Sequence, residues 1–570
     1  MKDELMASVL GLNSVFHDPS AAIVVDGVIL GAIEEERLSR RKSRKKPVPF
    51  SNWEFPELAA KWCISNAGLR PQDIDAVAYS FDPQIMKETN ADVSADYWEG
   101  LRQIYVEKTS HFIAKAIPQI AHVPITFVPH HTAHAASAYM CAPCASSAVL
   151  VLDGRGEVHS HLAGLVDAGD LTVLHQQLLP HSLGWLYEDL TEHLGFRRSA
   201  DEYKVMGLAA YGRPRFINQL RRAVYATGDG GFVTERIDWS EFVEPRDPTA
   251  NCQTIHADLA SSVQRRLEEV ALELVRWLHE RTGETSLTLA GGTFLNCVLN
   301  SRIYNDGPFS SVWVQPAAGD AGTALGAALY VSRALDDKPS PMGSAYLGRE
   351  FSSDELEGAL NNALLEYERP ADLVSEVAHA LARNLVVGWF QGRSEFGPRA
   401  LGSRSILAHP GYRDNIERLN SLKGREQFRP LAPMVLGEKV SEIFNDGPEV
   451  SPYMLFTHRA RTRWRERIPA AVHVDGTSRI QTIDRRSQPV IARLLDEFEV
   501  LTGLPLLVNT SFNTADRPIV DSPRDALECF GSSPIDVLVL GDRLVRKPRA
   551  GAGAILDAPS QGTIRDDVLP

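Results

Sequence analysis

Two stretches of the chain share one pattern of apolar runs separated by polar loops. In the first stretch, the apolar runs cover 8–12, 21–25 and 28–33, with a polar loop at 13–19. In the second, they cover 148–152, 160–166 and 171–174, with a polar loop at 153–157. Short apolar runs bounded by turn residues are typical of buried strands, and a repeated unit indicates two related half-domains.

A long amphipathic helix is expected over 255–281, where apolar residues recur at helical spacing and Gly283 marks the end. A strand at 286–290 follows, then a Gly291-Gly292 turn and a helical stretch over 293–300. Paired glycines at the end of a strand permit close approach of a ligand to the backbone.

Composition changes at 335–344, where Asp, Pro, Ser and Gly predict a linker before a second globular region. That region shows helical patterns at 356–365 and 374–383, and strand patterns at 385–389, 504–508 and 537–540. We therefore expect an α/β protein with domains over 1–345 and 346–547, followed by an extended tail over 548–570.

The bulk composition narrows the function classes. The 570 residues carry 59 Lys and Arg against 73 Asp and Glu, a net charge of −14, which argues against a nucleic-acid partner and permits an amine-rich substrate. No apolar run approaches the roughly 18 residues that a membrane span needs, and the acidic N-terminus is unlike a signal peptide. Together with six scattered cysteines, this predicts a cytoplasmic protein. Its oligomeric state, monomer or homodimer, stays open. The basic run over 37–46 is expected to be a solvated or mobile loop, with contact to an anionic ligand as the alternative.

His130 and His134 follow Pro129 at a spacing of four, so that on a helix both imidazoles face the same way. Such a pair suits a shared metal, and it suits a buried helix equally well. Asp153, after an apolar run, and Asp320, in a Gly-Asp-Ala-Gly segment, favour the metal. Two His with one or two Asp form a plausible site for a divalent ion with open positions.

A second set of polar residues lies in the C-terminal region. Its cations recur beside glycines and prolines: Arg393, Arg399, Arg404, Lys423, Arg425 and Arg429. Guanidinium and ammonium groups match phosphate oxygens, so we predict phosphate or acyl-phosphate binding, with a salt-bridged surface as the alternative. Ser511 and Asn513 follow the 504–508 strand and either donate to a phosphate or form a plain polar turn.

These segments resemble the O-carbamoyltransferases that act on antibiotics and nodulation factors. The resemblance covers nearly the whole chain and rests on these segments: 13–22 (NSVFHDPSAA), 34–41, the His130/His134 pair, 153–157, 202–212 (EYKVMGLAAYG), 290–300 (AGGTFLNCVLN), 392–410 and 423–433.

The resemblance implies an N-terminal domain of the actin and sugar-kinase fold, a duplicated ribonuclease H-like unit similar to the tRNA threonylcarbamoyl transferase. It implies a C-terminal α/β domain similar to threonylcarbamoyl-AMP synthase, whose two signatures match Lys423-x-Arg425 and Ser511-x-Asn513. The C-terminal domain would make carbamoyl adenylate from ATP, with Mg²⁺, and carbamoyl phosphate. The N-terminal domain would then transfer the carbamoyl group to a sugar hydroxyl.

The resemblance also implies residue roles. His130, His134 and Asp320 would hold Fe(II) or a similar divalent metal, with Asp153 as a fourth ligand or a nucleotide contact. Lys423 and Arg425 would act in adenylate formation, and His17 would be the base for the acceptor hydroxyl or would orient Asp18 or a phosphate. The remaining roles are nucleotide contacts in the N-terminal domain by Gly154, Gly156, Lys204, Gly291, Gly292 and Asn296, and acceptor contacts by Asn13, His17 and Asp18.

The implied acceptor is an aminoglycoside of the tobramycin or kanamycin type, in antibiotic biosynthesis. Alternatives are a nodulation factor or another antibiotic, and a macromolecule in protein maturation or tRNA modification. The absence of paired CxxC modules and the acidic charge argue against the macromolecule. A different class is an actin-like, nucleotide-gated binding protein, which would not need a second phosphate centre. The expected partners are small molecules, with neither nucleic acid nor membrane.

Overall fold

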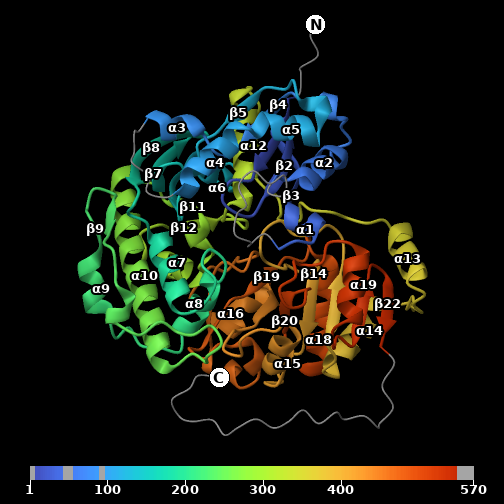
Figure 1. Ribbon diagram of the computed structural model, residues 1–570. Helices are drawn as coiled ribbons and strands as arrows, with labels where there is room; N and C mark the ends of the chain where they lie inside the picture. The colour runs from blue at the N-terminus through green and yellow to red at the C-terminus, as the bar shows by residue number, and fades with distance from the viewer. Residues whose placement is uncertain (1–6, 43–54, 89–96, 548–570) are drawn as a thin grey trace.

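Two five-stranded sheets with the same topology form the N-terminal part of the protein (Figure 1). The computed structural model describes residues 7–42, 55–88 and 97–547. The first sheet, in the order β3-β2-β1-β4-β5, contains β1 (Ser8–Asn13), β2 (Ser20–Val25), β3 (Val28–Glu34), β4 (Ala76–Tyr79) and β5 (Ile125–Phe127). The second, in the order β8-β7-β6-β11-β12, contains β6 (Ser147–Leu152), β7 (His159–Asp167), β8 (Asp170–Leu178), β11 (Ser286–Ala290) and β12 (Ser311–Val314).

In each sheet the first three strands form an antiparallel meander. The fourth strand then pairs parallel to the first, and the fifth parallel to the fourth. The repeated apolar pattern therefore corresponds to a repeated topology, as the sequence predicted.

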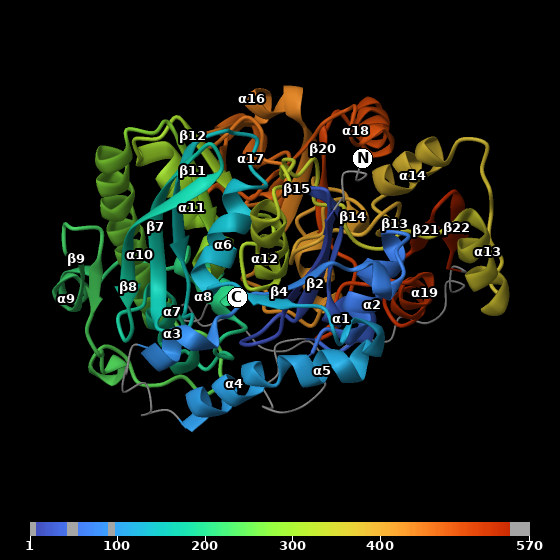
Figure 2. The same ribbon diagram turned by 90° about the horizontal axis from the view of Figure 1, so that it is seen from above.

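Two helices, α6 (His130–Tyr139) and α12 (Ala321–Ala334), lie between the two sheets (Figure 2). They touch backbone to backbone, because a Cβ at Gly326 of α12 would lie 1.8 Å from the carbonyl oxygen of Ala133 in α6. A Cβ at Gly11 of β1 would likewise lie 2.0 Å from the oxygen of Ala324. Only glycine permits such approaches. These contacts therefore set how closely α12 packs against α6 and against β1.

The outer face of the second sheet is covered by helices that share a core with β6 and β11. They are α7 (Leu183–His193), α8 (Glu202–Ala209), α10 (Thr254–Thr282) and α11 (Cys297–Asp306). The long helix predicted at 255–281 is confirmed, and Gly283 ends it in the left-handed conformation, with φ 67°. The helix predicted over 293–300 is wrong in detail, because Asn296 interrupts it. A 3-10 turn (Gly292–Leu295) comes first, and the Asn296 side chain then caps α11 by accepting a hydrogen bond from Leu299.

A seven-stranded mixed sheet forms the C-terminal region. Its order is β19 (Gln481–Ile483), β15 (Ala432–Leu436), β20 (Leu506–Ser511), β14 (Arg404–Ala408), β13 (Val387–Phe390), β21 (Val537–Leu540) and β22 (Arg543–Arg546). A small sheet, β16 (Phe444–Asn445), β17 (His458–Ala460) and β18 (Thr477–Ser478), lies beside it. Helices α13 (Ser353–Asn362), α14 (Leu373–Ala382), α15 (Asn415–Leu422), α18 (Pro489–Thr502) and α19 (Pro523–Gly531) complete it.

Two predicted boundaries in this region differ from the observed ones, one because of a helix cap and the other because of strand pairing. The helix expected at 356–365 begins at Ser353, because Ser352 and Glu355 form a reciprocal capping box. The strand expected at 504–508 continues as far as Ser511 by pairing with β14. The segment 335–344 forms neither helix nor strand after α12, in agreement with the predicted linker.

The two parts of the chain share a core and are joined by buried polar contacts. Phe428, Leu455 and Phe456 of the C-terminal part belong to the core cluster of the second N-terminal sheet. The backbone of Gly397 is held on both sides, since its N–H donates to Glu34 and its carbonyl accepts from Arg37. The C-terminal part is therefore docked against the N-terminal one by both apolar and hydrogen-bonded contacts.

The basic run is not the solvated loop that the sequence predicted, as far as it is described. Arg37 is buried, and Arg40 donates to the carbonyl oxygens of Pro518 and Ile519 and pairs with Asp525 at 3.1 Å. Charge runs normally face water, but these two guanidiniums join the two domains. The end of the run, from residue 43, and the tail over 548–570 lie outside the described residues. No helix in the described ranges is long and apolar enough to cross a membrane.

Candidate functional site: a metal-type cluster and a buried lysine

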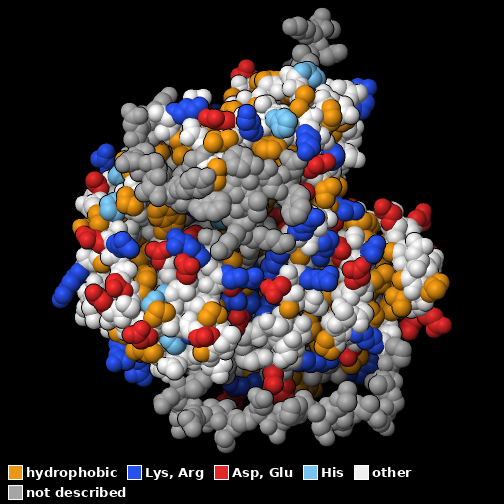
Figure 3. Space-filling view, in the orientation of Figure 1, with side chains coloured by type: hydrophobic (Ala, Val, Ile, Leu, Met, Phe, Trp, Pro, Cys, Tyr) orange, Lys and Arg blue, Asp and Glu red, His pale blue; other side chains and the backbone are white. Residues whose placement is uncertain are grey.

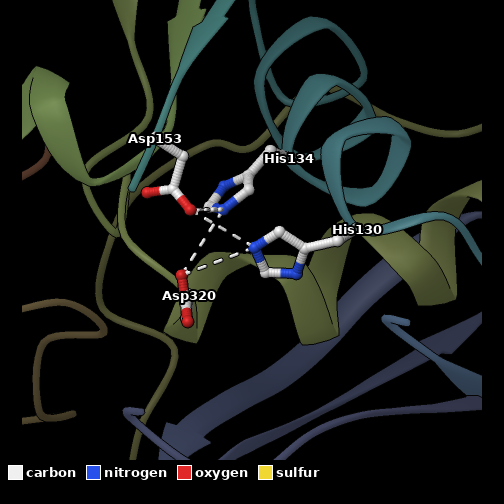
Figure 4. A group of neighbouring side chains, drawn as sticks. All are labelled: His130, His134, Asp153 and Asp320. Atoms are coloured by element: carbon white, nitrogen blue, oxygen red, sulfur yellow. Dashed lines mark ion pairs between the residues drawn. The ribbon is translucent and has the colours of Figure 1, made fainter. Parts of the chain in front are cut away.

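Four predicted side chains meet where α6, β6 and α12 come together (Figure 4). His130 is the first residue of α6, and His134 lies one turn later. Asp153 directly follows β6, and Asp320 directly precedes α12. One ligand atom from each residue lies within 4.8 Å of the others, and all four residues are buried.

Each imidazole faces both carboxylates. His130 Nε2 lies 3.4 Å from Asp153 Oδ2 and 3.7 Å from Asp320 Oδ1. His134 Nε2 lies 3.8 Å from the same atom of Asp153 and 3.5 Å from that of Asp320. Two nitrogens and two oxygens thus surround one small space, as expected for ligands of a divalent ion.

The surroundings orient these ligands. His130 Nδ1 lies 3.2 Å from the carbonyl oxygen of Ser80. When Nδ1 carries the proton it donates to this oxygen, and Nε2 is then an acceptor that faces the cluster. Asp153 Oδ1 accepts a hydrogen bond of 2.8 Å from the N–H of Gly292, which leaves Oδ2 for the cluster. Among the described residues, Nε2 of both histidines and both oxygens of Asp320 are buried without a hydrogen-bond partner. Buried acceptors without donors are costly, so the donor set fits a bound cation.

The electrostatics agree with a cation. Burial disfavours a charged His130, but the neighbouring Asp153 and Asp320 outweigh it and raise the pKa of His130 to about 9. Burial also disfavours a charged Asp153, yet the imidazoles hold the pKa of this carboxyl far below its usual range. The cluster therefore attracts positive charge, either as protons or as a metal ion.

His17 lies at the edge of this cluster. Its Nδ1 is 3.4 Å from Asp18 Oδ2 and 3.5 Å from Asp320 Oδ2. Burial lowers the pKa of His17, but these carboxylates raise it by more, and the pKa comes to about 10. The Asn13 amide is fully buried and donates to the carbonyl oxygens of His17 and Asp18, so it shapes the loop that carries them.

Lys423 forms the centre of the second site, in the C-terminal domain. Its ammonium donates to the Ser511 carbonyl oxygen, to Ser511 Oγ at 2.8 Å and to Asn513 Oδ1 at 2.5 Å. These oxygens are neutral, and no carboxylate in the described part of the chain forms an ion pair with Lys423. Burial, with Arg425 nearby, holds the pKa of Lys423 well below its usual range. Burial thus disfavours the charged form of Lys423, and an anion bound beside it would favour that form again, so the site fits an anionic ligand.

The family follows from two sequence matches that together span most of the chain. Residues 8–329 match the model described as carbamoyltransferase N-terminus, and residues 378–547 match the carbamoyltransferase C-terminus. The chain belongs to the carbamoyltransferase family. It is therefore an enzyme that carries out carbamoyl transfer.

Two relatives of this carbamoyltransferase illustrate the family. Nodulation protein NolNO of Sinorhizobium fredii is 36% identical over 94% of this chain and 80% of its own length. Nodulation protein U of Bradyrhizobium diazoefficiens is 31% identical over 88% and 91%. A solved structure of full-length HypF, in the phosphate- and nucleotide-bound form, covers 60% of this chain and 57% of its own at 14% identity. Its TM-score of 0.32 is too low to bear on the site.

Four glycines predicted to touch a nucleotide lie close to side chains or backbone next to the metal-type cluster of the carbamoyltransferase. A Cβ at Gly291 would lie 2.2 Å from the carbonyl oxygen of Leu152, and Gly292 orients Asp153. A Cβ at Gly156 would lie 2.6 Å from the His131 ring, and Gly154 lies against Glu188. Nucleotide contact by these glycines stays a prediction.

Two further predicted nucleotide contacts are also engaged elsewhere. Asn296 caps α11 and donates to Gln264. Lys204 pairs with Asp201 at 3.2 Å and with Glu426 of the C-terminal domain at 2.8 Å. Both side chains therefore have partners in the structure, and their contact with a nucleotide remains untested.

The predicted phosphate-binding arginines of the carbamoyltransferase divide into two groups. Arg404 is fully buried and donates to four backbone carbonyls, and Arg393 donates to three, one of them Leu30 in β3. Arg399 donates to the Leu295 carbonyl oxygen in the N-terminal domain. Arg425 and Arg429 lie near Lys423 and influence its charge. The second group has the better position for a phosphate.

Sequence reasoning did not single out two residues that support the cluster. Buried Glu157 accepts hydrogen bonds of 2.8 Å from the backbone N–H of both His130 and Asp82. Ser80, at the end of β4, receives the His130 hydrogen bond through its carbonyl oxygen. Glu157 is the last residue of the polar 153–157 loop, and this position was the one feature of the sequence that could have indicated its role. The role of Ser80 depends on a backbone atom and leaves no trace in the sequence.

Proposed function

We propose that this carbamoyltransferase is an ATP-dependent O-carbamoyltransferase that works in two stages at two sites. The single observation that supports this best is that one site is suited to a positively charged ligand and the other to a negatively charged ligand. Among the described residues, the cluster of His130, His134, Asp153 and Asp320 has buried acceptors without donors, and the buried Lys423 amine forms no ion pair with a carboxylate. The first fits a metal ion, and the second fits a phosphate-bearing substrate.

The shared topology of the two N-terminal sheets supports a finer fold proposal. Both halves follow one strand order and one set of strand directions. We assign them to a duplicated ribonuclease H-like unit, as in actin and sugar kinases. The C-terminal sheet, with Lys423 beside Ser511 and Asn513, is assigned to the threonylcarbamoyl-AMP synthase type.

In the first stage, carbamoyl phosphate and water give carbamate and phosphate. A carbamate oxygen then attacks the α-phosphorus of ATP, pyrophosphate leaves with its electron pair, and carbamoyl adenylate remains. Lys423, Arg425 and Arg429 would bind the phosphate oxygens on which negative charge develops. The product is a mixed anhydride, which is lost to water unless it stays enclosed.

In the second stage, the acceptor hydroxyl oxygen attacks the carbamoyl carbon and AMP leaves. A divalent ion such as Fe(II), held by His130, His134, Asp153 and Asp320, supplies Lewis-acid polarisation of an oxygen when bound. His17, at the edge of the cluster, would take the hydroxyl proton. It can do so only in its neutral form, which is favoured once the charge of Asp320 is compensated.

The proposed acceptor is a sugar hydroxyl of an aminoglycoside, of the tobramycin or kanamycin type. The net charge of −14 supports a cationic substrate. A nodulation factor is the second candidate, because relatives over most of the chain are named nodulation proteins.

Mass spectrometry tests the proposal directly. The purified protein is incubated with ATP, Mg²⁺, carbamoyl phosphate and either tobramycin, kanamycin or a nodulation factor, after loading with Fe(II) in one arm. The expected result is a gain of one carbamoyl group that requires both ATP and carbamoyl phosphate. If carbamoylated product forms without ATP, the adenylate stage is wrong.

A further inference from the structure

Helix α7 begins directly on the backbone that carries Asp153. The Ser182 hydroxyl, at the N-terminus of α7, donates to the carbonyl oxygen of Gly154 at 2.7 Å and accepts from the N–H of Trp185. A Cβ at Gly184 would lie 2.6 Å from the Cα of Gly154. This helix therefore has a fixed position relative to the metal-type cluster.

Four side chains of α7 share one face, because their spacing is i, i+3, i+4 and i+7: Trp185, Glu188, Asp189 and Glu192. Trp185 comes first, and it and Glu188 both lie against the backbone next to Asp153: Trp185 Cδ1 is 3.8 Å, and Glu188 Oε1 3.1 Å, from where a Cβ of Gly154 would be. Its side chain is partly exposed, and no hydrogen bond of its indole N–H is found within the described residues. An aromatic face with an unused polar end is suited to a sugar ring.

The guanidinium of Arg155 connects Trp185 to the opposite half-domain. Its Cζ lies 5.7 Å from the centre of the Trp185 ring and 5.3 Å from that of Phe16, the neighbour of His17. Phe16 in turn meets the ring of His130 edge to face, with 5.2 Å between centres. A row of aromatic and cationic groups thus connects α7 with His130 of the cluster and with the loop of His17.

The rest of the α7 face carries an excess of negative charge. Glu188, Asp189 and Glu192 all pair with one cation, Arg198, at 3.1, 2.5 and 3.7 Å. Three carboxylates against one guanidinium leave a surplus that favours amino groups on a ligand. In Figure 3, side chains of both signs gather on the surface over α7 and α8.

We propose that Trp185, with Arg155 beside it and the acidic face of α7 behind it, is the acceptor subsite, which binds an amino-substituted sugar ring next to the metal-type cluster. This inference rests on the proposed function, and it names residues that determine acceptor specificity. Trp185 would stack on the ring, and the carboxylates of α7 would receive its ammonium groups. The attacking hydroxyl would then point toward Asp153 and His17.

The test compares Trp185→Leu with Trp185→Phe and with Trp277→Leu, a matched control on α10. Carbamoylation of tobramycin is followed at varied acceptor concentration, and the KM for ATP serves as a check on the C-terminal site. We expect Trp185→Leu to raise the KM for tobramycin about tenfold with little change in kcat, since the ring is held less well. Trp185→Phe should recover most of the loss, and Trp277→Leu should behave like the wild type.

The acidic face is tested with the double variant Asp189→Asn, Glu192→Gln. Its KM for tobramycin should rise and lose its dependence on NaCl, because screened charge attraction has been removed. An unchanged KM for tobramycin in Trp185→Leu overturns the subsite, provided that the wild type makes product. A wild type that prefers an uncharged N-acetylglucosamine oligomer to tobramycin overturns the amino-sugar assignment. A wild type that carbamoylates neither overturns the proposed function itself.

Discussion

The two centres of this carbamoyltransferase are built in opposite ways. The N-terminal cluster collects acceptors at the starts of two helices and the end of one strand, and its ligands come from residues as far as 190 positions apart, Asp320 and His130. The C-terminal centre instead surrounds one buried amine with oxygens: Lys423, at a helix end, donates to Ser511 at a strand end. The buried acceptors of the first fit a cation and the buried amine of the second fits an anion, so what each site's residues lack supports the ligand proposed for it.

The largest expected effect comes from removing the cation of the second centre. Lys423→Ala should lower carbamoyl-phosphate-dependent pyrophosphate release from ATP at least about 100-fold, because developing phosphate charge loses its buried partner. Transfer from supplied carbamoyl adenylate should remain. Lys439→Ala, which removes a lysine paired with Glu499, is the matched control. Equal loss of both partial reactions in Lys423→Ala would contradict the separation of the two stages.

Removing a ligand from the first centre should give the converse result. His130→Ala is expected to lower divalent-metal affinity by about 100-fold or more and to block carbamoyl transfer, while pyrophosphate release continues. Metal content after dialysis and the two partial reactions measure this. His379→Ala on α14, an exposed histidine, controls for the loss of an imidazole. If the variant retains a full equivalent of metal, the ligand assignment is wrong.

The third prediction concerns the helix contact that positions the cluster. Gly326→Ala should destabilise the protein by about 1–3 kcal/mol and weaken metal binding, because α6 and α12 must separate to admit the methyl group. Thermal unfolding and metal titration follow the two effects. Gly358→Ala, on α13 where nothing lies within 4 Å, should instead leave the protein as stable or slightly stabilised.

The smallest expected effect distinguishes two roles for Lys204. If its contact with Glu426 is structural, Lys204→Gln should cost about 0.5–1 kcal/mol of stability, in a salt-dependent way, and leave the KM for ATP unchanged. A raised KM for ATP with unchanged stability would favour the nucleotide contact predicted from the sequence. Arg524→Gln, which breaks an exposed pair with Glu528, should change neither quantity.

The sequence predicts the first centre better than the second for a physical reason. The spacing of His130 and His134 is a local helical property, and the strand before Asp153 is visible in the apolar pattern. Asp320 was a candidate only because its Gly-Asp-Ala-Gly segment suits a ligand, since its contact with the histidines depends on how α12 packs between the sheets.

In the second region, charge alone was a poor guide. Arg404 looks like Arg425 in the sequence, yet it is fully buried and donates to backbone carbonyls. Arg37 and Arg40 look like part of a solvated run, yet they join the two domains. The packing of the two domains against each other decides which guanidinium contacts a carbonyl oxygen and which contacts solvent. No local sequence pattern encodes this packing.

The apolar docking of Phe428, Leu455 and Phe456 has a consequence for how such an enzyme can evolve or be engineered. These side chains complete the interior of the other domain, so a gene cut near residue 345 would yield one half with an unfilled core and another with an exposed apolar surface. Exchange of the two halves between relatives would succeed only if this trio and its receiving surface were exchanged together.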